Sequence, residues 1–292
     1  HRVDRRQRQM CIRDRINHYF AAAPCAQGGE GVALGIGDDC ALLDLPPGEQ
    51  LAVSTDTLVA GVHFPAVCDP LLLGQRSLAV AASDLAAMGA TAIGFTLALT
   101  LPDVGPDWLA AYANGLGRMA HRCRMSLIGG DTTRGPLSIT VTVFGRVPAG
   151  QALRRSGARP GDLLCVGGSL GKAAGALPLV LGEREAPAAQ AEPLLAHYWS
   201  PMPQLTLGAL LRGRATAALD ISDGLLADCG HIAKASGVAL EVNLAQVPVS
   251  PALEAFLGRE AAVQAALTGG DDYVLAFTLS LIHISEPTRP ER

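Results

Sequence analysis

Lysine is almost absent from this sequence of 292 residues. Lys172 and Lys234 are the only two lysines, so arginine carries nearly all of the positive charge, and the formal net charge at pH 7 is −4. Proteins that bind nucleic acids cluster lysine and arginine on one surface to neutralise phosphates. The acidic balance therefore argues against a nucleic acid as the main partner.

Paired cysteines and long apolar runs are absent as well. The seven cysteines are dispersed, their number is odd, and no two of them form a C-x-x-C pair. This distribution favours reduced thiols in a cytoplasmic protein over a disulfide framework or a zinc site. No apolar stretch approaches the roughly 20 residues that cross a bilayer, so we expect a soluble protein without a membrane partner.

The two ends of the chain differ in composition from the rest. Residues 1–15 contain six arginines and no helical or strand period, and residues 280–292 replace a strand-like run by irregular polar sequence. Both ends resemble translated adapter or vector sequence, with ordinary disordered tails as the alternative, and we leave them out of the fold prediction. Without residues 1–15, whose six Arg and two Asp carry +4, the net charge falls from −4 to −8.

The middle of the chain alternates strand-like and helix-like segments, which predicts an α/β fold. A segment rich in Gly, Pro and Arg begins at Pro148, so we predict an N-terminal domain over residues 16–148 and a C-terminal domain over residues 149–279. Strands are expected at 31–37, 51–55, 92–101, 125–130, 137–147, 162–168, 216–220, 238–242 and 273–278. Helices are expected at 69–88, 107–122, from 171, at 189–198, at 203–212, and at 222–236 with Ser222 as its N-cap.

Six acidic motifs in this part of the chain share one pattern, in which an apolar strand or helix ends, small residues follow and an aspartate appears. A single aspartate in such a place is usually a turn former or a helix cap. The motifs are GIGDDC (Asp38, Asp39), VSTDT (Asp56), AASDLAAMGA (Asp84), IGGDTT (Asp131), LDISDG (Asp220, Asp223) and TGGDDY (Asp271, Asp272).

The six motifs together favour a metal site. Strand ends in an α/β layer open on one rim, where neighbouring carboxylates repel one another unless cations bind them. Oxygen donors without a His or Cys cluster indicate Mg²⁺ or Ca²⁺, and the absence of a D-x-D-x-D-G spacing excludes an EF-hand. Mg²⁺ completes its shell with water and phosphates, so we expect a phosphate substrate. We predict that one cleft between the domains gathers Asp39, Asp56, Asp84, Asp131, Asp220 and Asp223.

Familiar nucleotide-binding motifs do not offer a simpler interpretation. VGGSLGKAAG (166–175) looks like a phosphate loop, but Val166 and Ala173 stand where that loop requires a glycine and a hydroxyl. We interpret it as a plain strand-to-helix turn. No G-x-G-x-x-G opens a βαβ unit, which disfavours a dinucleotide fold. His63 is a lone histidine near an acidic loop, and by itself it favours a structural role.

The ordered motifs GIGDDCALL, STDTLVAGVHF, SDLAAMGA, IGGDTTRG, RSGARPGD, DISDGLLAD and GGDDY closely resemble the thiamine-monophosphate kinase family over residues 16–279. This family shares a superfamily with aminoimidazole-ribonucleotide synthetase and selenophosphate synthetase. The resemblance implies a two-domain aminoimidazole-ribonucleotide-synthetase-like fold, with an N-terminal mixed sheet that forms a homodimer and a C-terminal α/β (α+β) domain. It also implies that ATP and several Mg²⁺ ions are used to phosphorylate thiamine monophosphate to thiamine diphosphate by direct in-line transfer.

The resemblance implies a role for each matching position. The metal ligands would be Asp39, Ser54, Thr55, Asp56, Asp84, Asp131, Asp220 and Asp223, of which Asp84, Asp131 and Asp223 would also be catalytic. ATP would contact Gly130, Asp131, Arg155 and Ser222. Thiamine monophosphate would contact His63 and Asp271.

The sequence departs from the family in two places. The family usually has glutamate at the position of Asp271, so the substrate contact is expected to be weaker or to pass through water. The family also continues well past residue 279 and supplies an aromatic residue there, so we expect the C-terminal domain to be incomplete in this sequence.

Two other functions stay open. One is another ATP-using synthetase of the same superfamily, although Cys11, the only cysteine near the start, lies in the foreign-looking segment and disfavours selenophosphate synthetase. The other is a nucleotide- or metal-binding protein without turnover. Assays with thiamine monophosphate and with the ribonucleotide substrate separate the enzymes, and calorimetry with Mg–ATP identifies binding without turnover.

Overall fold

The computed structural model describes residues 16–281. This part of the chain divides into two compact units. The first comprises the residues up to 85 and residues 91–146, and the second comprises residues 86–90 and everything from residue 147. The main division thus falls between residues 146 and 147, and the predicted domain boundary lies between residues 148 and 149. No helix in the described part combines the length and apolar character that a membrane span requires.

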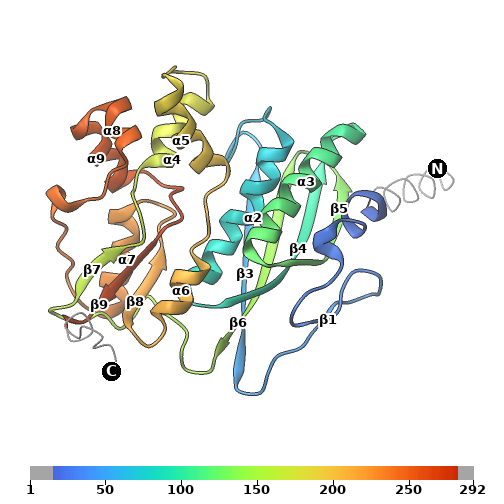
Figure 1. The fold of residues 1–292 in the computed structure, drawn as a ribbon, viewed down its shortest axis with the longest axis horizontal. Coiled ribbons are helices and arrows are strands. Elements are labelled where there is room, and N and C mark those ends of the chain that lie inside the picture. The colour runs from blue at the N-terminus through green and yellow to red at the C-terminus, as the bar shows by residue number, and fades with distance from the viewer. Residues whose placement is uncertain (1–15, 282–292) are drawn as a thin grey trace, which may run out of the picture. The chain divides into compact units, whose positions relative to one another are not determined.

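The first unit is built on a four-stranded mixed sheet (Figure 1). In sheet order its strands are β3 (Glu49–Val59), β6 (Ser138–Pro148), β4 (Thr91–Leu101) and β5 (Ser126–Arg134). β4 is antiparallel to β6 and parallel to β5. Two hydroxyl contacts join β3 to β6, Thr55–Thr142 at 2.9 Å and Thr57–Thr140 at 2.8 Å. Residue numbers rise on one strand as they fall on the other, so β3 and β6 are antiparallel.

Two long helices, α2 (Pro70–Ala87) and α3 (Pro106–Cys123), lie side by side over one face of this sheet (Figure 1). Both agree closely with the helices predicted at 69–88 and 107–122. Glycines set their close approach, because a Cβ atom on Gly74 would overlap the Tyr112 carbonyl and one on Gly115 would overlap the Leu71 carbonyl.

The other face of the sheet is open. Along β6, buried residues such as Val141 and Val143 alternate with partly exposed ones, as expected for a sheet covered on one side only. On the neighbouring edge strand β3, Leu51 and Val53 are 44% and 54% exposed. We call the side of the sheet away from α2 and α3 the open face; on β3 it carries Leu51, Val53, Thr55 and Thr57.

A small hairpin precedes this sheet. β1 (Val32–Leu34) pairs antiparallel with β2 (Leu42–Leu43), and two short helical turns, η1 (Ile16–Ala21) and η2 (Pro24–Ala26), come before it. The strand predicted at 31–37 therefore ends at Leu34. The GIGDDC motif forms the connection between the two strands, where Gly37 has a φ of +137° that favours glycine.

The second unit contains a three-stranded antiparallel sheet. Its order is β7 (Leu163–Val166), β9 (Leu275–Leu279) and β8 (Ala215–Asp220). Six helices and one short turn surround it in the chain: α4 (Lys172–Val180), α5 (Ala188–Trp199), α6 (Leu205–Leu211), α7 (Leu225–Ser236), η3 (Leu244–Gln246), α8 (Pro251–Leu257) and α9 (Arg259–Thr268). Helices and antiparallel strands thus confirm the α/β (α+β) character predicted for this half.

Both faces of this small sheet are buried. Leu219 on β8 and Ala276 on β9 face a core cluster that includes Ile232 of α7. Their neighbours in sequence, Ala218 and Phe277, face a second cluster that includes Leu211. The period of two along each strand therefore separates two cores, which explains why these strands read as continuous apolar runs.

Two predictions for this unit are wrong. Residues 238–242 form no strand, although Val238, Leu240 and Val242 alternate as predicted and pack on the core. Their backbone has no strand neighbour, and burial alone produced the pattern. In addition, α7 begins at Leu225 with Gly224 as its N-cap, and Ser222 does not cap it. The sequence pattern also missed helices α8 and α9.

Candidate functional site

The first unit brings three oxygen-bearing side chains together between β3 and α2. Ser54 and Asp56 occupy alternate positions on β3, and the Ser54 hydroxyl donates a hydrogen bond to the Asp84 carboxylate on α2. The pKa of Asp56 is raised to about 6, first by burial and then by the Asp84 carboxylate, while His63 acts in the opposite direction. Two carboxylates and a hydroxyl in this arrangement form a ligand set that a hard cation would stabilise.

His63 lies just beyond this group, in the turn after β3. Its Nδ1 accepts a hydrogen bond of 3.0 Å from the Val59 N–H, and its own N–H donates to the Val59 carbonyl. The turn after β3 therefore fixes the orientation of the imidazole ring.

Thr55 lies between Ser54 and Asp56 in sequence but its side chain does not join them. Successive side chains of a strand point to opposite faces, and the Thr55 hydroxyl contacts Thr142 on the open face. The direction of the Thr55 side chain thus gives no support to its predicted role as a metal ligand beside Ser54.

A second acidic group lines a pocket of about 180 Å³ in the first unit. It combines the GIGDDC connection, which includes Asp38 and Asp39, with Gly130 and Asp131 on β5. Gly130 has a φ of +150°, and a Cβ atom there would overlap the backbone of Leu97. Only glycine therefore brings this part of β5 so close to β4. The pocket therefore brings together Asp39, Gly130 and Asp131, and their individual roles stay predictions.

The two acidic groups lie on opposite edges of the same sheet. Asp131 on β5 is aligned with Ala98 on β4, Ala98 with Thr140 on β6, and Thr140 contacts Thr57 on β3. Asp56 precedes Thr57, so three strand spacings of about 4.8 Å, roughly 14 Å in a flat sheet, separate it from Asp131. This distance is too long for one Mg²⁺, whose ligands lie at about 2.1 Å, and fits separate cations or phosphates.

The shared pattern expected for the acidic motifs is wrong in three places. Asp56 lies inside β3, Asp131 inside β5 and Asp84 inside α2, so none of them follows the end of an element. β3 and β5 are the two edge strands of their sheet, where polar side chains inside a strand reach solvent. The edge position therefore accounts for the exposed Asp131, whereas Asp56 and Asp84 are partly buried and lie near each other.

The second unit presents its acidic residues around the turn from β8 to α7. Asp220 is the last residue of β8 and is buried, while Asp223 follows in the exposed turn. Asp228, in the first turn of α7, accepts hydrogen bonds from the N–H groups of the three turn residues. These are Ser222 at 3.0 Å, Asp223 at 2.9 Å and Gly224 at 3.1 Å, all to the Oδ2 atom. A single buried carboxylate thus fixes the turn that carries Ser222 and Asp223.

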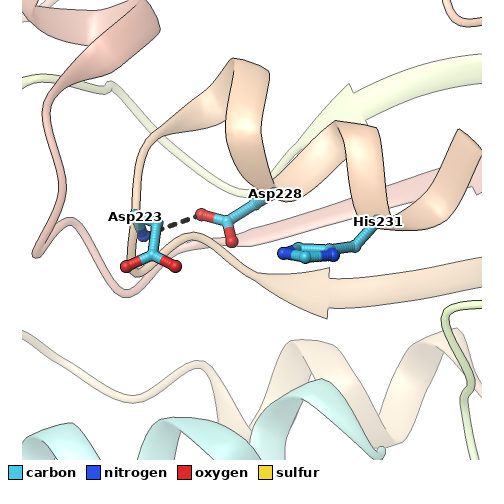
Figure 2. Close-up of side chains that lie close together, drawn as sticks. All are labelled: Asp223, Asp228 and His231. Carbon is cyan, nitrogen blue, oxygen red and sulfur yellow. Dashed lines mark hydrogen bonds between the residues drawn. The ribbon is translucent and has the colours of Figure 1, made fainter. Parts of the chain in front are cut away.

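Asp228 was missed by the sequence prediction, together with His231. Ligand atoms of Asp223, Asp228 and His231 lie within 4.8 Å of one another, and Figure 2 shows His231 on the same side of α7 as Asp228. The pKa of Asp228 is raised, chiefly by burial, and the three N–H groups act against that rise. The signal was present as an Asp-x-x-His spacing on one helix face, directly after the aspartate-rich turn.

The predicted substrate residue Asp271 adopts an uncommon backbone conformation. Its φ is +67°, and its Oδ1 accepts a hydrogen bond of 2.8 Å from the Tyr273 hydroxyl. Its N–H donates to the Ser222 carbonyl at 2.8 Å. Asp271 is therefore tied directly to the turn between β8 and α7.

Asp272, the next residue, is completely buried, and its side chain contacts the start of α4 instead of the turn between β8 and α7. It accepts hydrogen bonds from the N–H groups of Gly171 at 2.6 Å and Ala173 at 3.5 Å, at the start of α4. This carboxylate occupies the amides with which a phosphate loop would bind phosphate. The geometry agrees with the interpretation of residues 166–175 as a plain strand-to-helix turn.

The six aspartates expected in one cleft belong to two units. Asp39, Asp56, Asp84 and Asp131 lie in the first unit, and Asp220 and Asp223 lie in the second. Their convergence between the domains stays a prediction, as do the individual ligand roles.

Comparison with known proteins first defines the class. Residues 37–147 match the family described as AIR synthase related protein, N-terminal domain. This match covers most residues that line the pocket of Asp39 and Asp131, the group around Asp84, and the strands that carry Asp56 and Asp131.

The particular family follows from longer matches. Thiamine-monophosphate kinase of Escherichia coli (strain K12) is 49% identical over 249 residues, which are 85% of this chain and 77% of that protein. A crystal structure of thiamine-monophosphate kinase from Stenotrophomonas maltophilia K279a is 46% identical with a TM-score of 0.82, covering 93% of this chain and 84% of that one. The structure of AaThiL complexed with AMPPCP and TMP is 30% identical with a TM-score of 0.77, covering 85% and 81%. This chain belongs to the thiamine-monophosphate kinase family, as the ordered motifs predicted.

Proposed function

We propose that this chain transfers the γ-phosphoryl group of ATP to thiamine monophosphate and so forms thiamine diphosphate. The observation that carries the proposal is the structural match to AaThiL complexed with AMPPCP, a non-hydrolysable ATP analogue, and TMP. The identity to a thiamine-monophosphate kinase over most of the chain favours this reaction over that of another superfamily synthetase.

The donor atoms of the first unit fit Mg²⁺. Ser54, Asp56 and Asp84 offer only oxygen, and so do Asp39 and Asp131 in the pocket beside Gly130. Burial and the charge of Asp84 raise the pKa of Asp56. A bound divalent cation would lower this pKa again, because it favours the ionised carboxylate. Bound Mg²⁺ neutralises phosphate charge and orients the transferring group. Asp220 and Asp223 of the second unit extend the same ligand chemistry.

Several side chains act directly on the two phosphate substrates. The Nε2–H of His63 donates to the phosphate of thiamine monophosphate, and the Arg155 guanidinium binds the phosphates of ATP. Gly130 lies beside Asp131 in the lining of the pocket, so its backbone contacts ATP there. These contacts bring two anionic groups together in line, which is the main requirement for phosphoryl transfer.

No strong general base is needed in this proposal. The attacking atom is an oxygen of the substrate phosphate, which is already ionised at neutral pH. The fixed turn from β8 to α7 contributes preorganisation instead, because Asp228 holds Ser222 and Asp223 through three N–H groups. Asp271 is held against the same turn and contacts the thiamine side of the substrate.

The open face of the first sheet is the proposed contact of a homodimer. Leu51 and Val53 expose apolar surface on an edge strand whose other face is covered by helices. A twofold contact that pairs this face with itself would bury those side chains. A cytoplasmic location is part of the same proposal and agrees with the free cysteines within residues 16–281.

The function is tested by incubating the protein with Mg–ATP and thiamine monophosphate and measuring thiamine diphosphate by chromatography. The reaction should need both substrates and stop when EDTA removes the divalent cation. The aminoimidazole-ribonucleotide substrate serves as the control for another superfamily activity. If calorimetry shows Mg–ATP binding and no thiamine diphosphate forms, the chain binds nucleotide without turnover and the proposal fails.

A further inference from the structure

The loop that carries Arg155 is fixed by its main chain. It joins β6 to β7, and the Arg155 side chain is exposed. Among residues 16–281, the Arg155 guanidinium makes no hydrogen bond or ion pair with another side chain. The guanidinium is thus available to a ligand, and its position depends on what holds the backbone beneath it.

The loop is attached on the N-terminal side of Arg155 by two backbone contacts. The Leu153 N–H donates to the Met88 carbonyl at 3.0 Å, and the Arg154 carbonyl accepts from the Ala218 N–H at 2.8 Å. Ala218 lies inside β8, so residue 154 is anchored to the sheet of the second unit.

Arg155 itself and the residues after it are held by one side chain from a distant part of the sequence. The Ser236 hydroxyl, at the end of α7, accepts hydrogen bonds from the N–H groups of Gly157 and Ala158, both at 3.1 Å. The same hydroxyl donates to the Arg155 carbonyl at 3.3 Å. A hydroxyl group has one donor and two acceptor positions, so Ser236 uses all of them on this loop.

The shape of the loop matches this contact. Gly157 has a φ of +125°, and a Cβ atom there would overlap the Thr216 carbonyl of β8. A glycine at this position allows the loop to lie directly on the strand while its two N–H groups turn toward Ser236. Further along, the Asp162 carboxylate accepts from the Arg159 N–H and the Thr216 hydroxyl, which fixes the loop's end independently of Ser236.

We infer that Ser236 is a positioning residue for nucleotide binding, which sets the Arg155 backbone so that the guanidinium meets the phosphates of ATP. This inference rests on the proposed function, which assigns Arg155 to ATP. Ser236 touches no reacting atom and acts only through the loop. Helix α7 then has two such roles. Asp228 in its first turn fixes Ser222 and Asp223, and Ser236 at its end fixes the backbone of Arg155.

Ser236→Ala removes all three contacts and leaves the Arg155 side chain chemically unchanged. We expect the KM for ATP and the dissociation constant of Mg–AMPPCP to rise about five- to tenfold, with kcat and the KM for thiamine monophosphate changed less than about twofold. Ser236→Thr keeps the hydroxyl and should restore nucleotide affinity to within about twofold of the wild type.

Ser250→Ala is the matched control. The Ser250 hydroxyl accepts from the Leu253 N–H at 3.1 Å and caps α8, so its loss removes a serine–backbone contact of the same kind elsewhere in the second unit. This variant should lower the midpoint of thermal unfolding as Ser236→Ala does and leave nucleotide affinity unchanged.

A double-mutant cycle with Arg155→Ala decides whether Ser236 acts through the arginine. In the Arg155→Ala background, Ser236→Ala should weaken Mg–AMPPCP binding by less than about twofold. A full five- to tenfold effect in that background, or equal affinities for Ser236→Ala and Ser250→Ala, would overturn the inference. If Ser236→Ala does not fold, Ser236→Cys tests the same contact and should give an intermediate affinity.

Calorimetry with Mg–AMPPCP needs no turnover, so it separates this inference from the proposed function. A wild-type protein that binds the analogue and forms no thiamine diphosphate refutes the kinase activity while the Ser236 comparison still stands. A wild-type protein that is active, with nucleotide affinity unchanged in Ser236→Ala, refutes the inference alone.

Discussion

The Ser54 hydroxyl on β3 donates a hydrogen bond to the Asp84 carboxylate on α2, thirty positions later in the sequence. This contact joins the exposed edge strand of the first sheet to the second half of α2, where the residues from Leu78 to Ala87 other than Ser83 and Asp84 are apolar and buried. Asp84 is thereby held beside Asp56, whose pKa is raised in part by its charge. A charged residue inside such a helix is costly unless it is paired or binds a cation.

The first prediction compares Asp84 with Asp38. Asp84→Asn should lower kcat/KM for thiamine diphosphate formation by roughly 10²-fold or more, because it removes charge that neutralises phosphate through a cation. Asp38→Asn should have a small effect, since the Asp38 carboxylate accepts the N–H of Asp39 at 2.9 Å and an amide oxygen can replace it. Steady-state kinetics of both purified variants provide the test. Equal and small losses would contradict the assignment of Asp84.

The second prediction concerns the turn held by Asp228. Asp228→Ala deprives three N–H groups of their acceptor, and activity should fall about 10- to 100-fold, as is typical when a group that orients metal ligands is removed. Asp228→Asn keeps an oxygen acceptor and should retain activity within a few fold. Kinetics at several Mg²⁺ concentrations check this, and the Ala variant should need more Mg²⁺. Equal losses in both variants would show that the charge of Asp228, and not its hydrogen bonding, matters.

The third prediction uses the buried Asp272, whose pKa is raised to about 6, mainly by burial. Its pKa in the folded protein exceeds the ordinary value of 3.8, so folding favours the neutral acid. The stability that this group contributes is complete below about pH 4 and is lost as the pH rises through 6. The loss amounts to at most about 3 kcal/mol, from 1.36 kcal/mol per unit.

Asp272→Asn removes this titration while keeping an oxygen acceptor for Gly171. Urea unfolding between pH 4 and 7 should show wild-type stability falling relative to the Asn variant across that window. Asp103→Asn, at an exposed loop position, is the control and should follow the wild type. Parallel stability curves for wild type and Asp272→Asn would contradict the prediction.

The fourth prediction tests the open face of the first sheet. Val53→Arg places a charge in the proposed dimer contact and should convert the protein to monomers in sedimentation velocity experiments. Val67→Arg is the control, because Val67 is 91% exposed in a loop of the same unit. That variant should keep the wild-type sedimentation coefficient. A wild-type protein that is already monomeric at micromolar concentration would rule out the proposed contact.

The sequence by itself determined the family and most of the elements. Helices α2 and α3 follow from apolar stretches of sufficient length, and Pro106 marks the start of the second. The ordered acidic motifs identified the family because their residues and their order along the chain can be compared with those of the family directly. This comparison does not require the tertiary structure. The same motifs located Asp39, Asp84 and Asp131 as candidates before any geometry was known.

Tertiary structure decided which of these side chains meet and what supports them. Residues 238–242 alternate like a strand but do not pair with another strand. Hydrophobic alternation indicates which side chains are buried, and it does not show whether the backbone has a hydrogen-bonding partner. The strand period, read together with the edge position of β3, separates Thr55 from Ser54 and Asp56. Asp228 and Ser236 looked like ordinary helix residues, and their roles arise from backbone N–H groups, which are present in every residue but proline and leave no mark in a sequence.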